Sequence, residues 1–535
     1  MTSGDVAFYG AVSFLAGVAA AGWGINIYLC ILVLFLLFSV AIFFSAKGHS
    51  TPSELSPHDE RLRVSDYSIQ KISDSMNSMN GSASIGPPTD GASLLAGRAG
   101  RKKLGIAIAF FIFLLFFFGI FYYHLYNNVE ESSRNIVFNK TIAFSGIVSQ
   151  EPQLSEKFQK LELKLLPPSA GAIVLLVSLS PEINYGDVIR GEGAIESPSG
   201  SGREPIAFFP KIEISGHHQG FWLKEKLVDF KKSLISQFGK FLPSDSAALL
   251  GGLTFGWRGN FTQELKQQMS LSGTTHLVAL SGYNITILVL AVAALFGYFF
   301  SRRITFYSTG VIIFLFVLMV GGEASVLRAA IMGFLTLLAR ELGRLYSVRN
   351  AVALTAAAMI FVNPNFLFDI GFSLSFLSLL GIVYLEPSFK KFFRTCPEPS
   401  RRVGDKKKES FLSWRENGIT TLSAQLAVAP LLIQNFGQFS LTSIAANILI
   451  LEFVPLTMFL GFLLAGAGLL SHYLGFLIAL PINILLQYEV YVIKLFSYLR
   501  LPVEIDFNAW ILMAAYYGGL IIFIKYFNEQ EDKKV

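Results

Sequence analysis

A run of polar side chains stands at the start of an otherwise apolar segment in residues 272–287, which read SGTTHLVALSGYNITI. Its candidate functional residues are Thr275, His276, Ser281, Gly282, Tyr283 and Asn284. Within hydrocarbon an unsatisfied polar group is costly, so such groups normally face the interior of a helix bundle or a water-filled cavity. Hydroxyl, imidazole and amide groups in this pattern therefore favour the lining of a polar path across a membrane.

The composition indicates a membrane protein. The 535 residues are 53% hydrophobic and only 15% charged, they include 50 Phe, and their mean hydropathy is +0.53. Apolar runs at 25–45, 104–123 and 304–320 reach the roughly 20 residues that a bilayer-crossing helix needs. The chain is therefore expected to cross a membrane several times.

Basic flanks predict the orientation of these helices. Basic residues precede the apolar run at 104, and others follow the runs that end near 300, 340 and 390. Short basic flanks mark the cytoplasmic side. The sequence thus predicts a polytopic α-helical membrane protein with about 12 transmembrane helices and both termini cytoplasmic. Residues 441–470 and 473–499 are each predicted as one long helix, and breaks at Pro455 and Pro481 are the alternative.

Shifts in composition set the predicted domain boundaries. They are a transmembrane hairpin (1–45), a disordered cytoplasmic linker (46–103), a transmembrane helix (104–124), a β-barrel domain (137–216), amphipathic or interfacial helices (221–273), a transmembrane channel domain (274–527) and a cytoplasmic tail (528–535). The linker is rich in Ser, Asp, Asn and Gly, and its low hydrophobicity predicts disorder.

Alternation with a period of two predicts an inserted all-β domain. The predicted strands are 141–148, 160–165, 173–179, 187–195 and 211–214. Glycines at 146, 186, 191 and 193 stand where bulges or tight corners would let a small OB-like barrel close. The orientation above makes this domain extracytoplasmic. A spacer or assembly role and nucleic-acid binding both stay open, because residues 125–273 hold 15 Lys and Arg against 15 Asp and Glu.

The helix predicted from Phe221 has an apolar stripe beside basic residues. The stripe is Leu223, Leu227, Phe230, Leu234 and Phe238, and the basic residues are Lys224, Lys226, Lys231 and Lys232. This pattern is typical of a helix lying on the bilayer surface, and contact with nucleic acid is the alternative.

No enzyme, metal site or cofactor is expected. The chain has two cysteines, Cys30 and Cys396, and its seven histidines are scattered, so neither a disulfide framework nor a metal cluster is predicted. There is no phosphate-binding Gly-x-x-x-x-Gly-Lys loop for ATP. A membrane-embedded hydrolase using Ser281 and His276 is the weakest alternative. Two residues five apart on one helix point about 140° away from each other around the helix axis, which is poor for proton transfer between them.

Longer motifs carry a family resemblance. They are GGLTFGWRGNF (251–261), SGTTHLVALSGYNITIL (272–288), ASVLRAAIMGF (324–334), NPNFLFDIGFSLSFLSLLGI (363–382) and APLLIQNFGQFSLTSIAANILILEFVPL (429–456). In order and spacing they resemble the competence region of ComEC-type DNA-uptake channels. The barrel segment, with Tyr185, Gly186 and Asp187, is similar to the OB-like domain of that family. The usual motif has His after Ser-Gly-Leu, whereas this chain has Tyr283 and Asn284.

The resemblance implies an inner-membrane channel that passes single-stranded DNA into the bacterial cytoplasm during natural transformation. It implies a separate DNA receptor, a nuclease and a cytoplasmic ATP-driven motor as partners, besides the lipid bilayer, and leaves a homo-oligomer open. Many relatives carry a metallo-β-lactamase-like domain with a His-x-His-x-Asp-His motif, which these 535 residues lack, so the nuclease is expected to be another protein. A small-solute or lipid-linked transporter is the alternative function.

Further candidates for the DNA path lie beyond residue 287. They are Arg328, Asp369, Ser373, Ser375 and Asn447. A polyanion crossing a low-dielectric slab needs a wet path with a few cations, and Arg328 is the best candidate cation. An ion pair of Arg328 with Glu323 or Asp369 that only fastens helices is the alternative. Ser373 and Ser375 are two residues apart and are expected on different faces of their helix.

Overall fold

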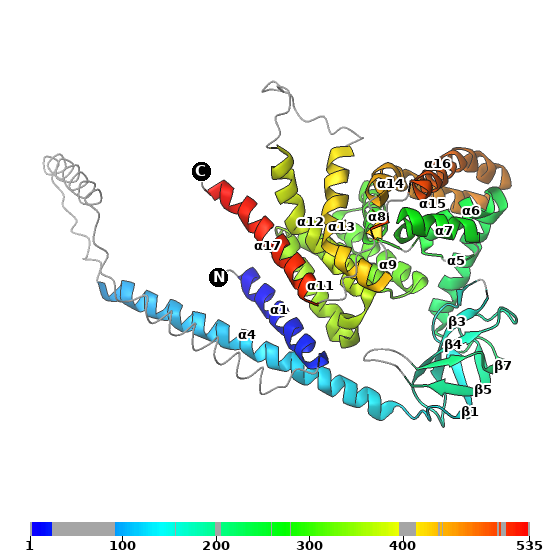
Figure 1. Ribbon diagram of the computed structural model, residues 1–535, viewed down its shortest axis with the longest axis horizontal. Coiled ribbons are helices and arrows are strands. Elements are labelled where there is room, and N and C mark those ends of the chain that lie inside the picture. The colour runs from blue at the N-terminus through cyan, green and yellow to red at the C-terminus, as the bar shows by residue number, and fades with distance from the viewer. Residues whose placement is uncertain are drawn as a thin grey trace, which may run out of the picture. The chain divides into compact units, whose positions relative to one another are not determined.

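The computed structural model, shown in Figure 1, describes residues 3–23, 91–155, 157–197, 205–257, 259, 261–278, 280–394, 414–436, 439–440, 442–499, 502–503 and 510–532. The described chain is mostly helical, with one small β-barrel (Figure 1). It divides into two compact units, residues 13–124 and the remainder.

Two helices pack together in the smaller unit. Helix α1 (Ser3–Gly22) contacts helix α4 (Gly91–Ser133) through glycines, and a Cβ on Gly17 would lie only 2.0 Å from the backbone oxygen of Phe116. Small residues allow this close approach of two backbones. The hydroxyl of Ser13 donates to the backbone oxygen of Ile112 at 2.7 Å, which fixes the register of the two helices.

Helix α4 differs from its predicted limits. It begins at Gly91, inside the stretch predicted as a disordered linker, and runs to Ser133, beyond the predicted end at 124. Ala, Leu, Arg and Lys dominate residues 92–104, and these are strong helix formers that let an apolar helix extend. The second predicted helix, 25–45, and the rest of the linker lie outside the described residues.

Five strands close the β-barrel. The described part of the domain has seven strands in all, β1 (Thr141–Val148), β2 (Gln153–Leu154), β3 (Gln159–Leu165), β4 (Ala172–Val177), β5 (Val188–Glu196), β6 (Ile206–Phe208) and β7 (Lys211–Gly216). The hydrogen-bonded order β1-β3-β4-β6-β5 returns to β1, while β2 pairs with β3 and β7 pairs with β5. All of these pairs are antiparallel except β4–β6. The alternating side chains of the strands fill the barrel with one apolar core.

All five predicted strands are present, within one or two residues at each end. Strands β2 and β6 were not predicted, because two or three residues are too short to show alternation. Gly191 illustrates the role of glycine in closing the barrel. It faces Phe144 across the β1–β5 pair, and a Cβ there would lie 2.7 Å from the Phe144 ring. The ring thus fills the space that the missing side chain leaves.

The remaining helices build the membrane region. They are α5 (Trp222–Phe241), α6 (Ser244–Phe255), α7 (Gln263–Ser272), η1 (Thr275–Leu277), α8 (Gly282–Phe299), α9 (Arg302–Val320), α10 (Ala324–Glu341), α11 (Val348–Val362), η2 (Pro364–Phe368), α12 (Ile370–Arg394), α13 (Trp414–Phe436), α14 (Thr442–Leu451), α15 (Val454–Leu470), α16 (His472–Tyr498) and α17 (Trp510–Asp532). Two short strands, β8 (Phe439–Ser440) and β9 (Pro502–Val503), pair with each other. One large apolar core joins α5–α10 with α14–α16.

Among the described residues, six helices are long and apolar enough to cross a membrane, or seven if one bent pair forms a single span. About twelve were predicted. The bent pair is α14 with α15, which meet at 49°. The prediction of one continuous helix over 441–470 was therefore wrong, because Pro455 lies in the first turn of a new helix, where proline is well tolerated. Helix α16 instead continues through Pro481.

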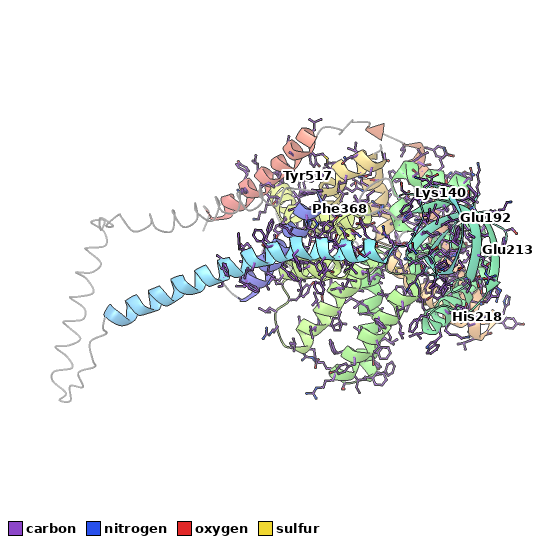
Figure 2. The ribbon with its side chains drawn as sticks, turned by 90° about the horizontal axis from the view of Figure 1, so that it is seen from below. Lys140, Glu192, Glu213, His218, Phe368 and Tyr517 are labelled. Atoms are coloured by element: carbon purple, nitrogen blue, oxygen red, sulfur yellow. The ribbon has the colours of Figure 1, made fainter. Side chains whose placement is uncertain are left out.

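Helix α6 differs from the predicted interfacial helices, because its residues from Ser246 to Phe255 are all buried. At the other end of the chain, α17 packs against α12 and hydrogen-bonds to α13. Tyr517 of α17, labelled in Figure 2, donates its hydroxyl to the backbone oxygen of Ala427 at 3.2 Å, and Tyr516 donates to that of Leu426. Two neighbouring tyrosines thereby fasten the last helix.

Candidate functional site

The polar segment 272–287 forms a break between two helices. Helix α7 ends at Gly273, which takes a left-handed conformation with φ 69°, and a short 3-10 turn follows. Helix α8 then begins at Gly282 with Ser281 as its N-cap. The Ser281 hydroxyl accepts a hydrogen bond from the backbone NH of Asn284 at 3.3 Å, as a capping serine does. A broken backbone of this kind supplies polar groups within a membrane domain.

Three of the polar side chains in the break are buried and bonded within the protein. Ser272 and Thr274 are fully buried, and their hydroxyl oxygens lie 2.8 Å apart. Asn284 is 3% exposed, and its amide donates to the backbone oxygen of Leu253 on α6 at 3.1 Å. The predicted path residue Asn284 is thus a fastener between α8 and α6, and its side-chain oxygen accepts from the Ser281 hydroxyl.

Three of the predicted path residues are accessible. Thr275 and His276 of the 3-10 turn are exposed, and Tyr283 on the first turn of α8 is 47% exposed. The Nδ1 atom of His276 lies 3.1 Å from the backbone oxygen of Gly273, so its other ring nitrogen faces away from this contact. Of the candidates in this segment, these three side chains present hydroxyl and imidazole groups to the surroundings.

Arg328 of α10 reaches between two neighbouring helices. Its guanidinium donates to the backbone oxygen of Ser375 on α12 and lies 5.9 Å from the centre of the Phe376 ring. The guanidinium also borders α8, because a Cβ on Gly282 would lie 2.4 Å from its Nη2 atom. Gly282 is therefore required for the close approach of this cation to the first turn of α8.

Arg328 makes no ion pair with an acidic side chain in the part of the chain that the structure describes. The predicted partner Asp369 caps α12 instead, where its carboxylate accepts from the backbone NH of Phe372 at 2.7 Å. The alternative of an ion pair with Glu323 or Asp369 was thus wrong. A guanidinium carries five N–H donors, and among the described residues a backbone carbonyl is its one acceptor, so this half-buried cation retains donors for an anion.

The remaining predicted residues lie on two helices, Ser373 and Ser375 on α12 and Asn447 on α14. Ser375 takes part through its backbone oxygen, which also accepts from the Ser378 hydroxyl at 3.0 Å, and Ser373 lies half-buried in the first turn of α12. Asn447 is 2% exposed on α14, and its side-chain oxygen has no hydrogen-bond partner among the described residues. The structure thus brings Gly282, Arg328 and Ser375 together.

One buried acidic residue was not predicted. Glu489 on α16 is fully buried, accepts a hydrogen bond from the Thr457 hydroxyl at 2.7 Å, and has a second carboxylate oxygen without a partner in the described chain. It is the one acidic residue of the 27-residue apolar helix α16. That pattern alone marks a functional candidate, because acidic groups within membrane segments are rare.

The geometry gives no support to the hydrolase alternative. The premise that His276 and Ser281 share one helix was wrong, because His276 lies on the 3-10 turn and Ser281 caps α8. The Ser281 hydroxyl donates to the side-chain oxygen of Asn284 at 3.0 Å rather than to an imidazole. A nucleophilic serine needs a base within hydrogen-bond reach.

Helix α5 uses its lysines to hold the barrel. Lys231 is buried and forms an ion pair with Glu151, Lys232 donates to the side chain of Asn184, and Lys224 donates to the backbone oxygen of Ser149 at 2.9 Å. Three of the four basic residues predicted to face lipid or nucleic acid therefore contact the barrel, while Lys226 is exposed. Burial lowers the pKa of Lys224.

Two histidines lie at the contact between α5 and the barrel, which forms the seam of the barrel. The Nδ1 atom of His217 lies 2.6 Å from the carboxylate of Asp187, and His218 pairs with Glu225 on the first turn of α5. The hydrogen bond with Glu225 raises the pKa of the His218 imidazole. The tyrosine of the Tyr-Gly-Asp run also contributes, since its hydroxyl accepts from the backbone NH of Phe221 at 3.1 Å.

The barrel surface carries both signs of charge. Figure 2 labels Lys140, Glu192 and Glu213 around the barrel, and Glu192 pairs in register with Lys211 across β5 and β7. Alternating acidic and basic side chains agree with the equal charge counts of this region. The described barrel thus offers no broad basic face to a polyanion.

Comparisons with known proteins agree with the motifs. A family model described as "Competence protein" matches residues 253–530, which include every helix of the site. The chain belongs to the competence protein family. This confirms the resemblance to ComEC-type competence proteins, and together with its long apolar helices it makes the chain a multi-pass membrane protein.

A curated relative is the ComE operon protein 3 of Bacillus subtilis (strain 168). It is 29% identical over 252 residues, which are 46% of this chain and 30% of that protein. The chain therefore matches less than a third of the length of its relative. No solved structure matches this chain.

Proposed function

We propose that this protein is an inner-membrane channel through which single-stranded DNA enters the cytoplasm during natural transformation. The observation that carries the proposal is the cation Arg328 at the polar first turn of α8, within the region that matches the competence family. Family membership supports a role in DNA uptake, and the site supplies the chemistry that a polyanion needs in a membrane.

The proposed path begins at the broken backbone before α8. Thr275, His276 and Tyr283 supply accessible polar groups there, and the aromatic ring of Tyr283 is available to stack on a base. Arg328 follows with uncommitted donors that can bind a phosphate. Because one cation and a few hydroxyls interact weakly, a strand can move past them without being trapped, as conduction through a pore requires.

The proposal extends to the arrangement of the chain in the membrane. We infer about twelve spans with both termini cytoplasmic and the barrel outside, as the basic flanks favour. The closed five-strand order of the barrel, with its parallel β4–β6 pair, supports an OB-like domain. We propose a spacer or assembly role for this domain, since its charges are balanced and α5 occupies the lysines at its seam.

The same proposal makes the protein a passive conduit and no enzyme. A DNA receptor outside the membrane, a nuclease and an ATP-driven motor in the cytoplasm are its proposed partners. The single-stranded product of the nuclease is then the substrate of the channel. A homo-oligomer is required only if a single copy of the protein does not conduct.

Ionic current through the purified protein in a planar bilayer tests the function. Single-stranded DNA added on the barrel side is expected to block the current, and duplex DNA of the same length is expected to block it less. Arg328→Gln should weaken the block, while Arg344→Gln, an exposed arginine beyond the end of α10, should not. A conducting pore that responds equally to both forms of DNA would refute the proposal.

Glu489 favours a second candidate, a small-solute or lipid-linked transporter, because buried carboxylates within membrane helices often bind coupling ions or substrates. The two candidates differ in what Glu489→Gln changes. Loss of transformation with an unaltered single-strand block would favour the transporter chemistry. Normal transformation in that variant would assign Glu489 a structural role.

A further inference from the structure

A cleft opens where helices α8, α9 and α10 meet, at the opposite end of α8 from the proposed DNA path. Its volume is about 530 Å³, and its lining includes Phe300, Arg302, Phe306, Leu337 and Arg340. Small-molecule sites typically enclose roughly 300–1,000 Å³. The cleft is therefore much larger than a single ion requires and suits a molecule with an apolar part.

The cleft combines apolar walls with cations at one end. Arg302 begins α9, and its Nε atom lies 3.1 Å from the carboxylate of Glu341 at the end of α10. Arg340, on the preceding residue of α10, is exposed and makes no ion pair within the described ranges. The lining thus holds two arginines and one carboxylate, and the positive N-terminus of the 19-residue helix α9 adds to the excess of positive charge.

Aromatic side chains around the cleft mark the level of the membrane surface. Tyr298 is 84% exposed, Phe299 is 68% exposed and Tyr307 is 69% exposed. Exposed tyrosines near the ends of membrane helices form belts at the height of the lipid headgroups. These aromatics favour headgroup depth for the charged end of the cleft, with its apolar walls toward the acyl chains.

Empty space beside Gly297 inside the cleft remains for a ligand, whereas the one threonine of the lining, Thr305, has its hydroxyl turned away from that space. The hydroxyl oxygen of Thr305 is buried and has no hydrogen-bond partner among the described residues. Gly297 lines the cleft, and a Cβ there would meet its nearest atom, a Thr305 methyl carbon, only at 4.0 Å. A larger side chain at 297 would thus enter the cleft without a clash at its base.

We propose that this cleft binds the phosphate headgroup of an anionic phospholipid, with the adjoining part of an acyl chain against its apolar walls. Arg302 and Arg340 recognise the phosphate. Basic pockets between membrane helices bind anionic headgroups in this way. The apolar walls favour a lipid over free phosphate or a nucleic acid, neither of which has an apolar chain to bury.

The test measures binding of phosphatidylglycerol and phosphatidylcholine to the detergent-solubilised full chain by native mass spectrometry. Wild type should prefer phosphatidylglycerol. Loss of one arginine should weaken that binding about fivefold, since a basic residue at an anionic surface contributes about 1 kcal/mol. Arg340→Gln should show this loss, and the matched variant Arg344→Gln, which removes the same charge outside the cleft lining, should not.

Gly297→Leu separates the cleft from general surface charge, because it fills the space and keeps every arginine. It should abolish the preference for phosphatidylglycerol. Equal binding of the two lipids to wild type, or full binding in Gly297→Leu, would overturn the proposal. Displacement of the lipid by inorganic phosphate alone would show a free phosphate site, and displacement by a single-stranded oligonucleotide would show a nucleic-acid site.

Discussion

Replacement of Gly282 by alanine is predicted to displace the Arg328 guanidinium while the helix bundle stays folded. The new Cβ would lie 2.4 Å from the Nη2 atom, and the guanidinium is the mobile end of a long side chain. Ordinary contacts are about 3.5 Å, so the guanidinium has to move by roughly 1 Å. That movement breaks its hydrogen bond to the backbone oxygen of Ser375.

The effect on stability follows from two opposing contributions. A hydrogen bond from a charged group contributes about 1.5–3 kcal/mol. Alanine in place of glycine restores about 0.4–1 kcal/mol by restricting the unfolded chain. The net destabilisation is therefore about 0.5–2.5 kcal/mol, which leaves most of the protein folded.

The assay compares transformation frequency with the amount of protein inserted in the membrane. Uptake per inserted protein should fall about tenfold or more in Gly282→Ala, the factor that corresponds to about 1.4 kcal/mol at one phosphate contact. Gly333→Ala is the matched control, because it changes α10 beside α8 and its Cβ would meet Val289 at an ordinary 3.4 Å. Normal uptake in Gly282→Ala, or an equal loss in Gly333→Ala, would refute the reasoning.

Three further predictions concern the seam of the barrel and the buried carboxylate. Lys231→Ala should destabilise the docking of α5 on the barrel by about 2–4 kcal/mol, because it leaves Glu151 without its buried partner. The control Lys226→Ala should change this stability by less than about 0.5 kcal/mol, and chemical denaturation measures both. The raised pKa of the His218 imidazole means that its pairing with Glu225 stabilises the folded state fully below about pH 6.5 and is lost as the pH rises through the folded pKa. Hydrogen-exchange protection factors at this seam, which are corrected for the faster intrinsic exchange at higher pH, should therefore fall as the pH rises, and His218→Ala should remove that fall. Thr457→Val should cost about 0.6–1.7 kcal/mol in steric-trap unfolding, because the carboxylate of Glu489 loses its donor, and an unchanged midpoint would contradict the bond.

Much of the fold follows from periodicity. The alternating segments predicted the five longer strands of the barrel, since each strand keeps one face in a closed core. The bend between α14 and α15 was given only as the alternative, because the apolar run continues across Pro455 and apolar composition does not distinguish a straight helix from two helices at an angle. Proline at 455 and proline at 481 look alike in sequence, yet only the first begins a new helix.

The sequence shows which polar residues the candidate segment contains but not which contacts they make. Asn284 and Ser281 were expected to line the path, but the helix break commits them to each other and to the backbone of α6. The partner of Arg328 could not be read from sequence, because a backbone carbonyl 47 residues away leaves no charge pattern. The lysines of α5 resemble an interfacial pattern, and only the tertiary contact with the barrel shows what they bind.

Site-specific photo-crosslinking to a strand in transit tests the central claim most directly. A photoreactive amino acid would replace Tyr283, on the first turn of α8, or Tyr298, near the end of the same helix and 84% exposed. We predict that internalising single-stranded DNA crosslinks at position 283 and not at position 298. Crosslinking at 298 alone, or none at 283 while uptake continues, would contradict a DNA path at the start of α8.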